Sequence, residues 1–162
     1  MVLPSWKPEL FHTLPGGPWP VDAATLPPTP VTELVEDWMC GDLGAHYDYL
    51  APDGSEIRLL AEFAGGGLAH CTLRPGLVTT AVRHRTVHEI WYVTEGHGEL
   101  WRRAGTGEQS VTTLWPGIGV DIPLGTTFQC RATGTGPLVV VMLTMPRWPG
   151  ADEAITEDGR WC

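Results

Sequence analysis

The sequence predicts an all-β fold, a barrel or sandwich of antiparallel strands. Residues 57–144 contain nine short runs rich in β-branched, aromatic and aliphatic side chains, mostly separated by glycine or proline. Glycine occurs 20 times and proline 15 times, which supplies many turn residues. No alternation of strand and helix patterns is visible, so a doubly wound parallel sheet is not expected. A chain of 162 residues is long enough for one domain with a sizeable core.

The predicted strands follow one another at roughly regular spacing, as in antiparallel sandwiches and barrels. Each consists of four to eight residues with high β propensity and ends near a turn signal. Their expected ranges are 57–64, 68–73, 78–84, 89–94, 98–103, 110–114, 119–122, 126–132 and 138–144.

Residues 1–56 are expected to form an irregular, proline-rich N-terminal arm rather than a second core. They hold nine acidic residues and one basic residue, and eight prolines lie within the first thirty positions. One helix is predicted over residues 29–41, with a threonine as its N-cap and a glycine at its end. Trp6, Trp19 and Trp38 favour docking of the arm along the barrel or a partner subunit.

The C-terminal residues 145–162 are expected to form a tail that packs on the barrel. Trp148 and Trp161 provide the aromatic surface for this packing. The sequence thus divides into an arm (1–56), a barrel (57–144) and a tail (145–162).

Charge and hydropathy argue against several classes of partner. The formal net charge is −9 and Lys7 is the only lysine, so neither nucleic acid nor an anionic membrane is an expected partner. No apolar run approaches the roughly 20 residues of a membrane span. The N-terminus lacks the pattern of a secretory signal, which favours a cytoplasmic location. The four cysteines form no CxxC pair, which argues against a thiolate zinc site.

Two segments, residues 83–98 and 116–129, carry the most informative spacing. Glu89 is followed by six residues and then Gly96, and four residues separate His84 from Glu89. The second segment contains three residues with the spacing G-x5-P-x-G: Gly117, Pro123 and Gly125. These spacings resemble the two motifs of the cupin superfamily.

The resemblance covers residues 57–144 and is to small single-domain bacterial cupins of the cupin 2 conserved barrel type. It implies a jelly-roll β-barrel and, commonly for small cupins, a homodimer. It also implies one divalent transition metal (Zn, Fe, Ni or Mn) held by three histidines and one glutamate.

The chain departs from the cupin motifs at two of these ligands. Val82 stands at the position of the first motif histidine, and Phe128 stands at the position of the second-motif histidine. His84 and Glu89 alone match the ligand set, and two ligands do not hold a transition metal tightly.

Three further side chains are candidate replacement ligands: His70, Gln129 and Cys130, which shares the face of Phe128 and is otherwise a small buried core residue. His70 lies on the strand that precedes residues 78–84, and imidazole is the stronger ligand for such metals. Gln129 adjoins the vacant position, although strand alternation directs it away from the face of Phe128.

The barrel interior is predicted from period-two alternation along the strands. Glu89 and His84 are then an acid and a base within an apolar, aromatic interior, where the pKa of a carboxyl is raised and a neutral histidine can pass a proton. The predicted substrate-binding residues share this face: Val82, Trp91, Phe128 and Cys130.

Three functions remain open at this point. The first is a small-molecule enzyme in which Glu89 and His84 perform acid–base chemistry, with or without a metal, as a cyclase, isomerase or lyase, on an apolar, aromatic or polyketide-like substrate. The second is a metal-dependent dioxygenase with His70, His84, Glu89 and Gln129 around iron. The third is a non-catalytic cupin that binds a small molecule.

Overall fold

The computed structural model describes residues 41 and 43–162, and these residues form an all-β structure. The predicted fold class is therefore confirmed. The helix expected over residues 29–41 and the three arm tryptophans lie outside the described residues, apart from Gly41. No helix in the described part of the chain is both long and apolar enough to cross a membrane.

The described residues contain strands of two to eight residues, together with one 3-10 helix, η3 (Ala151–Glu153). In chain order the strands are β1 (Tyr49–Leu50), β2 (Glu56–Phe63), β3 (Gly66–Leu73), β4 (Val82–His84), β5 (His88–Glu95), β6 (Gly98–Arg103), β7 (Gln109–Leu114), β8 (Gly119–Ile122), β9 (Thr127–Ala132), β10 (Leu138–Met145) and β11 (Ala154–Thr156).

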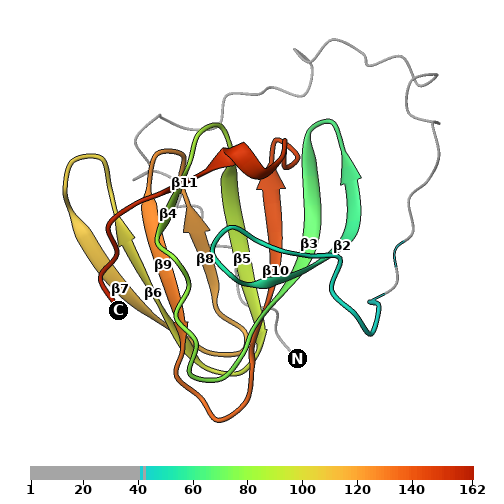
Figure 1. The fold of residues 1–162 in the computed structure, drawn as a ribbon, viewed down its shortest axis with the longest axis horizontal. Helices are drawn as coiled ribbons and strands as arrows, with labels where there is room; N and C mark the ends of the chain where they lie inside the picture. The colour runs from blue at the N-terminus through green and yellow to red at the C-terminus, as the bar shows by residue number, and fades with distance from the viewer. Residues whose placement is uncertain (1–40, 42) are drawn as a thin grey trace, which may run out of the picture. The chain divides into compact units, whose positions relative to one another are not determined.

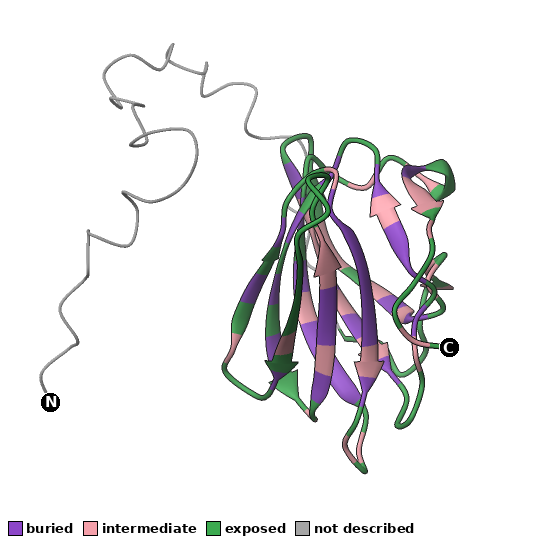
Figure 2. Ribbon diagram, turned by 90° about the vertical axis from the view of Figure 1, so that its left-hand side faces the viewer, coloured by how far each residue is buried: buried purple, intermediate pink, exposed green. Residues whose placement is uncertain are grey.

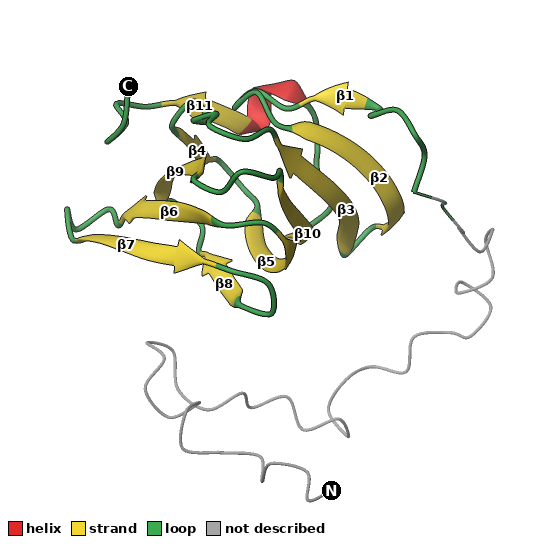
Figure 3. Ribbon diagram, turned by 90° about the horizontal axis from the view of Figure 1, so that it is seen from below, coloured by secondary structure: helices red, strands yellow, loops and turns green. Residues whose placement is uncertain are grey.

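The strands form two antiparallel sheets that enclose one core. One sheet has six strands in the order β1-β2-β3-β10-β5-β8, and the other has five in the order β11-β4-β9-β6-β7. From β3 onward the chain passes repeatedly from one sheet to the other, which gives the jelly-roll connectivity. Figure 1 shows β7, β6, β9 and β4 on one side and β5, β10, β3 and β2 on the other, and Figure 3 shows the same arrangement from below.

The core lies between the sheets and is built by alternation along each strand. On β5 the buried residues are Glu89, Trp91 and Val93, and their neighbours in the sequence are exposed. Figure 2 shows buried residues recurring along the strands, while the connecting loops are mostly exposed. Leu100 and Leu114, from β6 and β7 of the other sheet, are fully buried in the same cluster.

All nine predicted strands are present, and their ends differ by at most four residues from the expected ranges. The largest difference is at β4, which begins at Val82 because residue 78 forms only an isolated bridge with Arg131. Gly96 joins β5 to β6 with φ of 75°, a conformation that favours glycine.

The structure extends the barrel beyond the predicted range 57–144 at both ends. β1 pairs with β2 eight residues before the expected start, so Tyr49 belongs to the six-stranded sheet. β11 pairs with β4 and adds the tail to the five-stranded sheet, with Ala154 opposite His84. Both additions matter for function because they lie beside the cavity described below.

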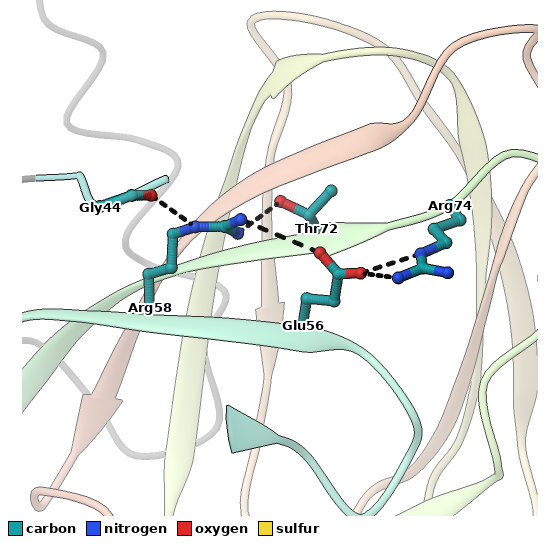
Figure 4. Close-up of polar contacts among 5 residues, drawn as sticks. All are labelled: Gly44, Glu56, Arg58, Thr72 and Arg74. Carbon is teal, nitrogen blue, oxygen red and sulfur yellow. Dashed lines mark hydrogen bonds and ion pairs between the residues drawn. The ribbon is translucent and has the colours of Figure 1, made fainter. Parts of the chain in front are cut away.

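A group of polar contacts fixes the chain that enters the barrel to the outer side of β2 and β3 (Figure 4). Arg58 donates hydrogen bonds to the carbonyl of Gly44 at 3.0 Å and to Thr72 Oγ1 at 3.4 Å. Arg74 donates to Glu56 Oε1 through two nitrogens, at 2.9 and 2.7 Å. The contacts of Arg58 tie residue 44 to β2 and β3, and those of Arg74, which follows β3, tie that end of β3 to the start of β2.

Candidate functional site

A cavity opens between the two sheets near β1, β4 and the C-terminal tail. It contains about 670 Å³ of space free of atoms, open solvent at its mouth included. Its wall combines residues from both sheets with Trp148 from the tail. The residues that line it include Tyr49, Asp53, Glu62, Val82, His84, Glu89, Trp91, Phe128 and Trp148.

Glu89 is a buried carboxyl on the cavity wall, only 4% exposed. It points inward because it occupies an interior position of β5, two residues from Trp91. The indole Nε1 of Trp91 donates a hydrogen bond of 2.7 Å to Glu89 Oε2. Burial raises the pKa of Glu89 to about 8, while the Trp91 hydrogen bond opposes the shift and the charge of Asp53 adds to it. Glu89 is therefore mostly protonated at neutral pH.

His84 lies across from Glu89, at the end of β4, and is 5% exposed. Its ring meets Phe128 and Trp148 edge to face, with centroid distances of 5.1 and 5.0 Å. Its Nδ1 is buried and has no hydrogen-bond partner. Burial lowers the pKa of His84 to about 4, so the imidazole is neutral at pH 7.

The position of the Glu89 proton follows from the hydrogen bond with Trp91. An indole N–H only donates, so Oε2 accepts; because the carbonyl oxygen of a neutral acid is a better acceptor than its hydroxyl oxygen, this bond favours the proton on Oε1. Oε1 is the oxygen that faces His84, at 3.9 Å from Nδ1. This distance is too long for a hydrogen bond, and both side chains line the same cavity.

The structure adds three residues to the site that the sequence analysis did not assign to it. Trp148 was expected only to pack, yet it lines the cavity and contacts the His84 ring. Tyr49 and Asp53 were placed in the arm, but β1 and the turn after it bring both to the cavity wall. No local pattern identifies them, because the segments that carry them are positioned by the pairing of β1 with β2 and of β11 with β4.

The predicted metal ligands do not converge. His70 lies on β3 between Ala69 and Cys71, which are both buried, and so it points to the opposite face of the sheet. Its neighbours there include Arg58, whose charge helps to lower the pKa of His70 after burial. His70 is therefore removed from the predicted ligand set.

Gln129 also points away from the cavity and has another structural task. Its Nε2 donates to the carbonyls of Thr79 and Trp161, both at 2.9 Å. Its Oε1 accepts from the backbone amides of Arg160 and Trp161, at 2.8 and 2.9 Å. With all four positions used, Gln129 holds the tail against β9 and is not free to bind a metal.

Within residues 41 and 43–162, no three histidine, cysteine, aspartate or glutamate side chains are grouped so as to hold a metal ion. The described residues thus do not fit the metal centre that the cupin motifs imply. The iron-dependent dioxygenase hypothesis loses two of its four proposed ligands, His70 and Gln129.

Of the predicted substrate-binding residues, three line the cavity together with the acid and the base: Val82, Trp91 and Phe128. Cys130 is also an interior residue of β9, but it is buried in the core and does not line the cavity. Burial raises the pKa of its thiol to about 12. Cys130 is therefore a core residue with no direct access to a ligand.

Comparisons by sequence give no match, either to a protein-family model or to a curated protein. Solved structures do match. CapF from Staphylococcus aureus, a capsular polysaccharide assembling protein, is 16% identical with a TM-score of 0.59, over 76% of this chain and 35% of CapF. KdgF from a Halomonas species is 20% identical with a TM-score of 0.56, over 70% of this chain and 97% of KdgF.

The cupin domain of Cnp3 from Schizosaccharomyces pombe is 10% identical with a TM-score of 0.51, over 57% of this chain and 64% of that domain. The match to CapF spans about a third of the length of that protein. At these identities the similarity establishes the fold: this chain has the cupin fold, as its two motifs predicted.

Proposed function

We propose that this protein is a small-molecule enzyme that uses Glu89 as a general acid and His84 as a general base. The substrate is a compact, flat compound with a largely apolar body, of aromatic or polyketide type. The reaction moves a proton between two atoms of the substrate, as in an isomerisation, a cyclisation or an elimination.

One observation carries the proposal: a protonated carboxyl faces an unpartnered, neutral imidazole nitrogen across 3.9 Å inside an aromatic cavity. A buried polar group without a partner is costly, so its presence beside a cavity is a reason to expect a ligand there. Two groups whose pKa values have moved apart through burial also give a clear assignment of acid and base.

In the proposed mechanism the aromatic side chains Trp91, Phe128 and Trp148 hold the flat body of the substrate. Glu89 donates its Oε1 proton to an oxygen of the substrate on which negative charge develops. His84 Nδ1 accepts a proton from a carbon or hydroxyl of the same substrate. The hydrogen bond from Trp91 stabilises the Glu89 carboxylate that results.

The experiment is a ligand screen followed by product analysis on the full chain. Flat hydroxylated aromatic and polyketide-like compounds are tested by thermal shift. A tropolone belongs in this panel because a CapF structure contains the inhibitor 3-isopropenyl-tropolone. Each compound that binds is then incubated with the protein and followed by mass spectrometry and NMR.

We expect at least one bound compound to be converted by the wild-type protein. Glu89→Gln keeps the acceptor for Trp91 but loses the acidic proton. It should therefore bind the compound but convert it at least about 100-fold more slowly than the wild-type protein. His84→Ala should show a similar loss. Binding without chemical change across the whole panel would instead support the non-catalytic binding function.

A further inference from the structure

The ionisable side chains on the cavity wall have an unusual balance. Among the described residues, neither arginine nor lysine lines the cavity. The ionisable residues that do line it are Tyr49, Asp53, Glu62, His84 and Glu89. A ligand in this cavity therefore meets three carboxyl groups and, at neutral pH, no protein cation.

Two of these carboxyl groups already have a partner side chain within the protein. Glu62 forms an exposed ion pair with Arg147 at 3.3 Å. Glu89 is protonated at neutral pH and bonded to Trp91. Asp53 has no ion pair with any residue that the structure describes, so it is the acid that can interact with a charge on the ligand.

Asp53 is also held in a fixed position. Its Oδ1 accepts hydrogen bonds from the backbone amide of Ser55 at 3.0 Å and from the Ser55 hydroxyl. Its Oδ2 has no hydrogen bond to another described residue. Burial raises the pKa of Asp53, and the two bonds from Ser55 oppose this shift. The result is a positioned carboxyl group with one oxygen still available.

A second observation supports the presence of a ligand at this wall. His84 is more than nine-tenths buried, lines the same cavity and has an unpartnered Nδ1. The aromatic rings beside it supply flat apolar surface, and their π faces attract cations. The cavity thus offers apolar surface, a proton-transfer pair and one available carboxyl oxygen.

We propose that the ligand of this cavity is a flat compound with a protonated basic nitrogen, which pairs with Asp53 Oδ2, and that the cavity rejects carboxylates and phosphates. The proposal rests on the function proposed above for the place where the ligand binds. A carboxylate or phosphate would lie near the negative charge of Asp53, without a lining cation to offset it. An ammonium group would gain an ion pair with Asp53 in a partly buried site.

The test compares three compounds that share one flat ring system and differ in charge: tryptamine, tryptophol and indole-3-propionate. Their affinities for the full chain are measured by isothermal titration calorimetry at pH 7. We expect the ammonium compound to bind at least about tenfold more tightly than the alcohol, a difference of about 1.4 kcal/mol, and the carboxylate to bind most weakly. The same ranking is measured for the corresponding phenyl and naphthyl compounds, so that ring size does not decide the outcome.

A variant and a matched control locate the effect. Asp53→Asn keeps an oxygen for Ser55 and removes the charge, so it should weaken the ammonium compound about tenfold and leave the alcohol unchanged. Asp121→Asn removes the same charge from β8, where the side chain is 66% exposed and paired with Arg102. It should leave all three affinities unchanged.

Three results would overturn the proposal: equal or tighter binding of the alcohol or carboxylate, an unchanged ammonium affinity in a folded Asp53→Asn protein, or no binding of the ammonium compound at any ring size. If Asp53→Asn fails to fold, the ranking in the wild-type protein decides alone. These results concern binding only. The proposed acid–base function is judged by conversion in Glu89→Gln and His84→Ala, so the two proposals can fail separately.

Discussion

Burial shifts the pKa values of Glu89 and His84 in opposite directions, which leaves both side chains neutral between about pH 4 and about pH 8. In water the order is reversed, because a carboxyl loses its proton before an imidazolium does. The exchange follows from one physical cause, the loss of water around both groups. It gives the site a proton donor and a proton acceptor at the same pH.

The first prediction concerns stability. Between pH 6.5 and about 8 the unfolded state has an ionised Glu89, whereas the folded state keeps it protonated. The folded state binds more protons, so the free energy of unfolding should fall as pH rises, by about 2 kcal/mol over this window. Between pH 4.5 and 6.5 His84 has the opposite effect, because only the unfolded state protonates it, and the two contributions nearly cancel.

Chemical denaturation at several pH values measures this effect. Glu89→Gln should abolish the decline above pH 6.5 and, below it, should leave a free energy of unfolding that rises with pH because of His84. Glu108→Gln removes an exposed carboxyl outside the cavity and serves as the control. A wild-type protein whose stability changes in parallel with that of Glu89→Gln from pH 6.5 to 8 would show that Glu89 is ionised in the fold.

A second prediction concerns the pH profile of conversion. A general acid with a pKa of about 8 and a general base with a pKa of about 4 give a bell-shaped profile of kcat/KM with limbs near these values. Trp91→Phe removes the hydrogen bond that lowers the pKa of Glu89, so the alkaline limb should move to higher pH. Trp101→Phe removes an indole that donates to Gln109 instead, and it should leave the limb in place. A limb that does not respond to Trp91→Phe would assign it to another group.

At the scale of elements, the strands with strong local patterns could be predicted and the short ones could not. β5 and β9 are marked by alternation and by flanking turns, and the placement of Glu89 and Phe128 on one interior face follows from period two alone. β1 and β11 have only two and three residues, and they form because β2 and β4 offer edges to pair with. Such pairing is a tertiary effect, which no local pattern records.

The same distinction explains which parts of the site were found. Val82 and His84 lie on β4 and Trp91 lies on β5, and alternation along each strand determines which side chains face the interior. Asp53 and Trp148 belong to segments whose position depends on β1 and on the tail, so their approach to the cavity could not be inferred. The orientation of His70 could have been inferred from the sequence. Alternation along the strand places His70 and its neighbour Ala69, which is buried, on opposite faces of the sheet.

A third prediction concerns the tail, which depends on one amide side chain. Gln129→Leu keeps a side chain of similar volume but leaves the backbone amides of Arg160 and Trp161 without an acceptor. We expect a loss of about 1–3 kcal/mol in the free energy of unfolding and faster hydrogen exchange across residues 157–162. Gly159→Ala should act in the same direction, since a Cβ there would lie 2.7 Å from Gln129 Oε1.

Gln109→Leu is the matched control, because it changes the other glutamine, which accepts one hydrogen bond from Trp101. It should leave hydrogen exchange in the tail unchanged. Unaltered exchange at residues 157–162 in Gln129→Leu would mean that the ion pairs of Glu157 with Arg83 and Arg103 hold the tail without the glutamine.

At the scale of the whole molecule, the cavity wall is complete only when β1 and the C-terminal tail are counted with the predicted strands. The region expected to be an arm contributes β1 and the turn that carries Asp53, and the region expected to be a tail contributes Trp148 and β11. The cavity therefore depends on segments from the two ends of residues 43–162. The homodimer and the cytoplasmic location stay predictions.

The last prediction compares chains that begin at residues 39, 49 and 57. The chain from residue 57 keeps every strand predicted from the sequence but lacks β1, the carboxylate of Asp48 that accepts from the Leu59 amide at 2.7 Å, and the Asp53 turn. It should melt about 10 °C below the chain from residue 39. The chain from residue 49 keeps β1 but lacks Asp48 and the contact of Arg58 with Gly44, so it should fall between the two.

Ligand binding separates this effect from a general loss of stability. Without Tyr49 and Asp53 the cavity loses the wall near β1, and the edge of β2 is exposed, which also favours aggregation. The chain from residue 57 should therefore bind no compound from the panel at a temperature where it is still folded, whereas the chain from residue 49 should bind as tightly as the chain from residue 39. Equal melting temperatures and equal affinities for all three chains would mean that the barrel and its cavity are complete from residue 57 onward. In that case β1 would be an addition to the sheet that the fold does not require.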